Sequence, residues 1–275
     1  MNINPLLERV STEITRSISI RYASSIPHYP LVEYPKCGGT WVCRMLAESL
    51  ALPFAQYSRL PVAMPSVIHN HWKFHPKFEN CTYLMRDGRD VMVSFYFHFT
   101  RKVGNPNQKN VDIYIDKLRK ILGENADFQD VQANLPAFIE HLFAKPVGCR
   151  QNWRDHNLAW MNQPKVHYLK YEDLRHDCVA AVTKHVSSLA SDRLNEDQIE
   201  RAVDHFSMKR MTGRNPGEED KGSFIRKGVV GDWKNHFTRE AAEVFDGLAG
   251  DVLVQLGYET DNSWVGRCDP AQNAE

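Results

Sequence analysis

Residues 34–41, YPKCGGTW, place a lysine, two glycines and a threonine within one short segment. Glycine lets the backbone adopt turns in which successive N–H groups point toward one anion. Lys36 adds a positive charge and Thr40 adds a hydroxyl donor. The segment therefore predicts a phosphate-binding loop, although a plain Gly-Gly turn between a strand and a helix would use the same glycines.

The order of these residues favours one class of phosphate site over another. In the P-loop of ATPases and kinases, the lysine follows the second glycine. Here Lys36 precedes Gly38 and Gly39. The order argues against an ATP-dependent kinase or NTPase, which stays open as one alternative. A non-catalytic nucleotide-binding module is the other.

The elements around this loop predict an α/β fold. Residues 30–35 form an apolar segment that predicts a strand ending at the loop, and a helical apolar pattern begins at Thr40. An anion can then bind at the amino end of the helix. Further strands are predicted at residues 81–85 and 165–171, and further helices at residues 90–99, 172–190, 195–206 and 238–257. This alternation is typical of a single domain with a central parallel sheet flanked by helices, in a P-loop-like nucleotide-binding architecture.

Four regions outside these elements are expected to be irregular or variable. They are an N-terminal extension at residues 1–30, a polar insertion at residues 101–135, a glycine-rich and charged loop at residues 212–231, and a frayed tail at residues 262–275. Long loops in a compact domain are commonly functional. The loop at residues 212–231 is therefore a candidate for contact with a ligand.

The composition limits the class of protein. The 275 residues contain 34 Lys and Arg against 34 Asp and Glu, so no global positive field favours a nucleic acid partner. The 6 cysteines form no CxxC pair, and no acidic or Cys/His motif predicts a metal site. The chain has no apolar run of the roughly 20 residues that cross a membrane. We expect a cytoplasmic protein with reduced thiols.

The segment YPKCGGTW resembles the YPKSGTTW loop of cytosolic-type sulfotransferases, which use 3′-phosphoadenosine 5′-phosphosulfate (PAPS). Cys37 stands where the family has serine, and Gly39 stands where it has the first threonine. Both changes remove a hydroxyl and keep a backbone N–H. The resemblance implies that a cradle for the 5′-phosphosulfate is formed by Lys36, Cys37, Gly38, Gly39 and Thr40.

Two later segments match the family's 3′-phosphate site. Residues 86–94 fit the pattern R-x-x-x-D-x-x-x-S, and residues 226–233, RKGVVGDW, match RKGxxGDW. An arginine can bind a phosphate through two parallel hydrogen bonds. The resemblance assigns the 3′-phosphate to Arg86, Ser94, Arg226, Lys227 and Gly228.

Smaller matches imply an adenine site. Trp41 follows the glycine loop, Tyr171 lies in KYEDL, and residues 205–211, HFSMKRM, resemble the family's HTSFKEM. Met208 replaces an aromatic residue there, and a methionine can fill the same space. The implied adenine contacts are Trp41, Tyr171, Ser207, Met208 and Met211.

The catalytic residues follow from the family's KTH motif, which aligns with residues 69–71. His71 is then the general base, because histidine titrates near neutral pH. His69 replaces a family lysine, whose charge His69 or Lys73 would have to supply. Lys36 is suited to stabilise the leaving phosphate. The resemblance implies PAPS as co-substrate, 3′-phosphoadenosine 5′-phosphate (PAP) as product, and no metal.

The sequence does not identify the acceptor or the oligomeric state. The resemblance implies transfer to a hydroxyl or amine of a small molecule, a lipid or a sugar, bound among residues 1–30, 53–68 and 101–150. The family's dimer segment has a partial match in Lys234, Thr238 and Glu243. Arg239 replaces a central valine in it, which makes the same homodimer doubtful because a charge replaces an apolar contact.

Overall fold

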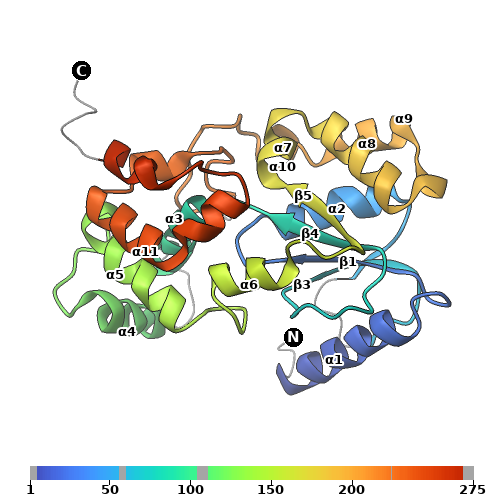
Figure 1. Cartoon of the computed structure of the whole chain (residues 1–275), viewed down its shortest axis with the longest axis horizontal. Coiled ribbons are helices and arrows are strands. Elements are labelled where there is room, and N and C mark those ends of the chain that lie inside the picture. Colours follow the sequence, from blue (N-terminus) through green and yellow to red (C-terminus); the bar gives the residue numbers. More distant parts are fainter. Residues whose placement is uncertain (1–4, 56–59, 104–110, 224, 269–275) are drawn as a thin grey trace. The chain divides into compact units, whose positions relative to one another are not determined.

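The computed structural model describes residues 5–55, 60–103, 111–223 and 225–268 of the chain. It divides into two compact units (Figure 1). The first unit comprises Met1–Met85 and Ala159–Gly213, and the second comprises Arg86–Leu158 and Arg214–Glu275. We describe the two units separately.

A five-stranded parallel sheet forms the centre of the first unit. Its strand order is β2-β3-β1-β4-β5. The strands are β1 (His28–Glu33), β2 (Phe54–Ala55), β3 (Ser66–Asn70), β4 (Cys81–Met85) and β5 (Val166–Lys170). All six residues of β1 and all five of β4 are buried, as the near-continuous apolar runs of an internal parallel sheet require. The predicted α/β class with a central parallel sheet flanked by helices is confirmed.

Helices cover this sheet. In Figure 1, α8 and α9 lie on one side of the sheet and α1 lies on the other. Tyr83 of β4 stacks on Trp160, with ring centroids 5.4 Å apart, and Trp160 also stacks on Phe78. The helices of this unit are α1 (Pro5–Arg21), α2 (Gly39–Ser49), α7 (Tyr171–His176), α8 (Cys178–Leu189), α9 (Glu196–His205) and α10 (Met208–Thr212), with a short 3-10 turn η1 (Ser191–Arg193).

The described part of the second unit is helical. Its core gathers large aromatic side chains, among them Phe138, Trp153, Phe245 and Trp264, all fully buried. The elements are α3 (Gly88–Val103), α4 (Val111–Leu122), α5 (Val131–Ala144), η2 (Asp232–Asn235), α11 (Arg239–Gln255) and η3 (Asn262–Cys268). Helix α6 (Trp153–Trp160) has residues in both units.

Three of the regions expected to be irregular or variable contain helices, since α1 (Pro5–Arg21) occupies most of the N-terminal extension at residues 1–30. The insertion at residues 101–135 holds the end of α3, all of α4 and the start of α5, while residues 104–110 lie outside the described part. Helix α4 buries Leu118 and leaves its polar residues outward. The expectation of a loop rested on the Gly, Pro and Asn residues elsewhere in residues 101–135. The expected frayed tail holds η3, which buries Trp264 against Phe245. Only residues 269–275 of that tail lie outside the described part.

The helix predicted at residues 172–190 is two helices. Asp177 separates α7 from α8 in an extended conformation, and its carboxylate accepts the N–H of Ala180 as an N-cap.

The capping pair predicted at the start of α9 is correct for only one of its two side chains. Asn195 accepts the N–H of Gln198, but the Gln198 side chain donates to Glu48 O instead of turning back. The partner of Gln198 lies 150 positions away along the chain, so local spacing could not predict it.

Candidate active site

The glycine loop lies at the carboxyl end of β1, where parallel sheets bind their ligands. The register pairs Leu31 of β1 with His69 of β3. Alternate residues of a strand share a face, so Glu33, His69 and the following His71 come together on one side of these strands. Neither histidine is close to Glu33 in the sequence, and the strand pairing alone makes them neighbours.

Glu33 connects the loop to both histidines. One carboxylate oxygen accepts the N–H of Gly39 at 2.6 Å, and the other lies 3.0 Å from His69 Nε2. The backbone carbonyl of Glu33 accepts from His71 Nδ1 at 2.9 Å. The side chain of Glu33 is almost fully buried. We call Glu33, His69 and His71 the Glu–His cluster.

Sequence reasoning missed Glu33. The available signal was a carboxylate inside the apolar segment PLVEYP, directly before the loop. A buried carboxylate needs several hydrogen bonds to remain in place. Glu33 obtains them from the loop amide and from an imidazole.

The backbone of the loop has the left-handed conformations that an anion nest uses. Lys36 has φ 78° and Gly38 has φ 106°. Gly38 is the N-cap of α2. The amides of two other predicted nest residues already have acceptors, since Cys37 N–H donates to Tyr34 O and Gly39 N–H to Glu33. The cradle is therefore less open to an anion than the glycines suggested.

The environment of His71 favours its neutral form. Burial lowers the pKa of His71, the nearby Glu33 carboxylate raises it, and His69 lowers it, with a net shift below the ordinary value of 6.5. Since a carbonyl can only accept, Nδ1 carries the proton in the bond to Glu33 O, and the neutral ring then has its lone pair on Nε2. His71 is thus held in the tautomer that can take a proton at Nε2.

The Glu–His cluster also has the composition of a metal site. Its three ligand atoms lie within 4.8 Å of one another. The hydrogen bond between His69 and Glu33 satisfies these two groups directly. No metal is needed to explain their arrangement.

The predicted adenine residues also meet within the first unit. The ring centroids of Trp41 and Tyr171 lie 5.9 Å apart in an edge-to-face arrangement, and Trp41 Nε1 donates to Phe206 O at 2.8 Å. Tyr171 lies directly against Gly38. Ser207 and Met208 follow Phe206, where the Ser207 hydroxyl caps α10 and Met208 is buried. Met211 lies in the same short helix.

The predicted 3′-phosphate residues lie in the second unit, where carboxylates pair with three of them, Arg86, Arg226 and Lys227. Arg226 pairs with Asp232 and Glu219, and Lys227 Nζ lies 2.6 Å from Asp232. Burial raises the pKa of Asp232, but hydrogen bonds from His236, Lys227 and Arg226 outweigh it and hold the pKa well below its usual range. Asp232 thus gathers the positive charges expected to meet a phosphate.

Asp90 fixes the end of the loop at residues 212–231. Its two carboxylate oxygens accept the N–H of Gly231 at 2.8 Å and of Trp233 at 2.9 Å. Arg86 lies 4.0 Å from the same carboxylate. Within the loop, Arg214 donates to the carbonyls of Glu218, Ile225 and Arg226. Ser94 lies half-buried one turn after Asp90 on α3, and Gly228 has φ 62°.

A model of the family described as "Sulfotransferase domain" matches residues 69–257, more than half of the 275 residues. The chain belongs to the sulfotransferase domain family. The match starts at His69, so it includes both histidines and the two 3′-phosphate segments. It does not include the glycine loop of this family member.

Individual relatives agree with the family. Human Sulfotransferase 1E1 is 30% identical over 60% of this chain, and the match spans about half (51%) of that relative's length. Rabbit amine sulfotransferase is 26% identical over 78% of this chain and 77% of its own. Among solved structures, mouse sulfotransferase SULT7A1 complexed with PAP has a TM-score of 0.60 at 21% identity, covering 94% of this chain and 93% of its own. A retinol dehydratase with androsterone and PAP has a TM-score of 0.54 at 16% identity, covering 88% and 85%. These structures share the fold.

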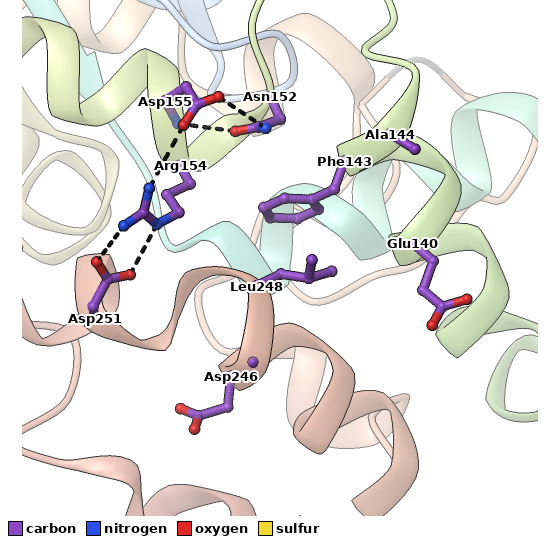
Figure 2. Close-up of a pocket in the computed structure, with 10 residues that line it drawn as sticks. Glu140, Phe143, Ala144, Asn152, Arg154, Asp155, Asp246, Leu248 and Asp251 are labelled. Atoms are coloured by element: carbon purple, nitrogen blue, oxygen red, sulfur yellow. Dashed lines mark hydrogen bonds and ion pairs between the residues drawn. The ribbon is translucent and has the colours of Figure 1, made fainter.

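The structure also has a pocket that is lined by none of the predicted site residues. It measures about 800 Å³ and lies in the second unit (Figure 2). Figure 2 shows Arg154 between Asp155 and Asp251, and the Arg154–Asp251 pair is 2.7 Å long.

Among the residues that the structure describes, no helix combines the length and apolar character needed to cross a membrane.

We expect Gly39→Ala to destabilise this family member. A Cβ at residue 39 would lie 2.5 Å from both the Glu33 carboxyl carbon and His69 Nε2, so the Glu33–His69 pair would have to move. Such overpacking costs about 1–3 kcal/mol. In a Glu33→Ala background one of the two close contacts is gone and His69 loses the hydrogen bond that holds its ring in place, so the ring can turn away and the cost of Gly39→Ala should largely disappear. A double-mutant cycle by urea unfolding measures this coupling, and additive effects would contradict it.

We also expect Asp90→Ala to release the end of the loop. The substitution leaves the Gly231 and Trp233 amides without their acceptor, which costs about 1–3 kcal/mol for each buried amide. Hydrogen exchange at these two amides should accelerate, while exchange in β4 stays unchanged. Asp90→Asn retains one acceptor oxygen and should give an intermediate rate. Unchanged exchange in Asp90→Ala would show that these bonds do not hold the loop.

Proposed function

We propose that this chain is a PAPS-dependent sulfotransferase that transfers the sulfuryl group of PAPS to a hydroxyl or amine acceptor and releases PAP. The observation that carries the proposal is the position of His71 next to the glycine loop at the start of α2. Both His71 and the loop residue Gly39 are hydrogen-bonded to Glu33. The PAP in the structures of mouse SULT7A1 and retinol dehydratase supports the choice of nucleotide.

The residues of the first unit fit such a nucleotide in part. Positive φ angles at Lys36 and Gly38 are suited to an anion cradle, and the Trp41–Tyr171 pair offers aromatic surface for a base. The Gly39 amide donates to Glu33, so the proposed phosphosulfate contact depends mainly on the Lys36 ammonium and the Thr40 hydroxyl. We propose that Arg86, Ser94, Arg226, Lys227 and Gly228 bind the 3′-phosphate, because they match the family's sequence pattern.

In the proposed reaction, His71 Nε2 accepts the proton of the acceptor hydroxyl or amine. The acceptor atom forms a bond to sulfur while the bond from sulfur to the bridging phosphate oxygen breaks. The electron pair of that bond stays on the phosphate, where Lys36 stabilises the growing negative charge. His69 stands beside His71, with ring centroids 5.1 Å apart, and its contact with Glu33 sets its orientation.

Binding of PAP tests the proposal directly. A ligand that binds only the native state at 100 times its dissociation constant stabilises that state by about 2.7 kcal/mol. PAP should therefore raise the melting temperature by several degrees, as measured by differential scanning fluorimetry. ATP with Mg²⁺ should have little effect, because the lysine precedes the glycines. A shift from ATP equal to that from PAP would favour the kinase or NTPase alternative, and no shift from PAP would contradict the assignment.

A further inference from the structure

One face of helix α3 gathers polar and aromatic side chains in the second unit. Asp90, Ser94 and Phe97 follow one another at intervals of four and three residues, so they share this face of the helix. The carboxylate of Asp90 accepts the N–H groups of the residues on both sides of Asp232, at 2.8 and 2.9 Å. The fold therefore holds residue 232 beside the face of α3 that carries Ser94.

Phe97 brings a cation of the loop at residues 212–231 to this face. The guanidinium of Arg226 lies 4.2 Å from the centroid of the Phe97 ring. The His236 ring meets the same ring edge to face, with centroids 5.3 Å apart. An aromatic face attracts a cation in this position. Phe97 follows Ser94 by one helical turn, so Arg226 lies about one turn of α3 away from Ser94.

The carboxylate of Asp232 accepts four donors in this structure. Its Oδ1 accepts from Lys227 Nζ at 2.6 Å and from the Asn235 amide at 2.9 Å. Its Oδ2 accepts from the Arg226 guanidinium and from His236 Nε2, the latter at 3.3 Å. A carboxylate has about four lone-pair positions, and this side chain is only 3% exposed. Asp232 is therefore a buried anion whose hydrogen-bonding capacity is filled.

The carboxylates neutralise the two cations of this segment. Arg226 pairs with Glu219 as well as with Asp232, and Lys227 pairs with Asp232. These four side chains carry two positive and two negative charges, so together they have no net charge. A phosphate monoester carries about −1.5 to −2 charges at pH 7 and has three acceptor oxygens. Such a phosphate receives the full attraction of Arg226 and Lys227 only when a carboxylate gives them up.

We propose that Asp232 is an internal counter-ion that the 3′-phosphate of PAPS or PAP displaces, and that this competition makes the site selective for a dianionic group. The inference rests on the proposed function, because it takes Arg226 and Lys227 as ligands of the 3′-phosphate. On binding, both cations turn from the carboxylate to the phosphate, while Asp232 keeps the Asn235 amide and His236. A hydroxyl or a monoanion at the 3′ position has too little charge to drive this exchange.

The exchange of partners determines the direction of the expected effect. Separating the Asp232 carboxylate from two cations costs free energy, and this cost lowers the affinity for a 3′-phosphate. Removing the negative charge of Asp232 removes the cost, so the affinity for PAP should rise. A residue that only positions the cations would have the opposite effect, because its loss would lower the affinity.

Titration calorimetry of Asp232→Asn with PAP tests the inference. Asparagine keeps the size of the side chain and one acceptor oxygen. We expect the Kd of PAP to fall by about tenfold, the equivalent of one charge-assisted hydrogen bond. AMP lacks the 3′-phosphate, so its affinity should not change. An unchanged or higher Kd of PAP in Asp232→Asn, or an equal gain in affinity for AMP, would overturn the inference.

A second variant keeps the test decisive if Asp232→Asn does not fold. Glu219→Gln removes the other carboxylate that pairs with Arg226, at a side chain that is 31% exposed, and should lower the Kd of PAP by about threefold. Asp220→Asn is the matched control, because it changes the net charge equally at a carboxylate that accepts the N–H of Gly222 at 2.9 Å. It should bind PAP as the wild type does. Equal Kd values for the two variants would contradict the inference.

The same titrations separate this inference from the proposed function. If PAP does not bind the wild type, the sulfotransferase assignment fails and the inference fails with it. If PAP binds the wild type but neither Asp232→Asn nor Glu219→Gln binds it more tightly, Asp232 is only a structural partner of the two cations. In that case the proposed function stands and the inference is overturned.

Discussion

Replacing His71 by alanine is expected to lower kcat by about 10²–10⁴-fold, the range that a positioned general base contributes. The substitution removes the Nε2 lone pair that would accept the proton of the acceptor. PAP should still raise the melting temperature as in the wild type, because the glycine loop and α2 are untouched. Turnover is measured with labelled PAPS and any acceptor that the wild type uses.

A matched control separates the base from the general effect of losing a histidine. His75 lies four residues further along the same segment, and its ring packs against Phe78 rather than near Glu33. His75→Ala should retain most of the activity. Activity in His71→Ala within about threefold of the wild type would show that another group takes the proton.

The pH dependence gives the same base a second signature. A general base works when deprotonated, so kcat/KM should fall as the pH drops through the pKa of His71. Burial lowers that pKa below 6.5, which extends activity to more acidic pH than an exposed histidine would allow. The Glu33 charge raises the pKa of His71. Glu33→Gln should therefore move the acidic limb of the profile to still lower pH.

Replacing Lys36 by methionine is the second substitution for which we expect a large loss. Methionine keeps an unbranched apolar stem and removes the charge that would stabilise the leaving phosphate. Loss of one such stabilising group typically costs about 10²–10³-fold in kcat. Steady-state kinetics with labelled PAPS and titration calorimetry with PAP would separate the loss in rate from any loss in binding. A kcat unchanged within threefold would contradict a role for Lys36 in the reaction.

The backbone conformation of Lys36 allows a second variant that tests the charge of the side chain separately from the stability of the protein. Its φ of 78° is uncommon for a residue with a Cβ and costs about 1–2 kcal/mol. Lys36→Gly relieves this strain but adds freedom to the unfolded chain, so stability should change little while kcat falls as in Lys36→Met. The exposed Lys184 of α8 is the matched surface position. Lys184→Met should leave both quantities unchanged.

Local features could be predicted from the sequence. The strand at residues 81–85 has the predicted bounds, and the caps at Asn195 and Thr238 begin α9 and α11 as expected. The loop YPKCGGTW lies between a buried strand and a helix, as its order predicted. These features depend on neighbours within a few residues, so spacing and residue type are sufficient to predict them.

The sequence analysis missed helices α1 and α4 for different reasons. Helix α1 buries hydroxyls and exposes leucine and valine, so its apolar stripe does not identify an inner face. In helix α4 the apolar residues Val111, Ile115, Leu118 and Leu122 do have helical spacing, but the polar character of residues 101–135 predicted an irregular segment.

The contacts that form the candidate site depend on the three-dimensional fold. The register that pairs Leu31 with His69 brings Glu33 to both histidines, although the sequence offered it only as a charge inside a strand. Asp90 reaches Gly231 and Trp233 across about 140 positions of the chain, and Asp232 takes the cations expected to meet a phosphate. The partners of a carboxylate are the backbone amides and cations that the fold brings within about 3 Å. The separation of these groups along the chain does not predict which of them will be close.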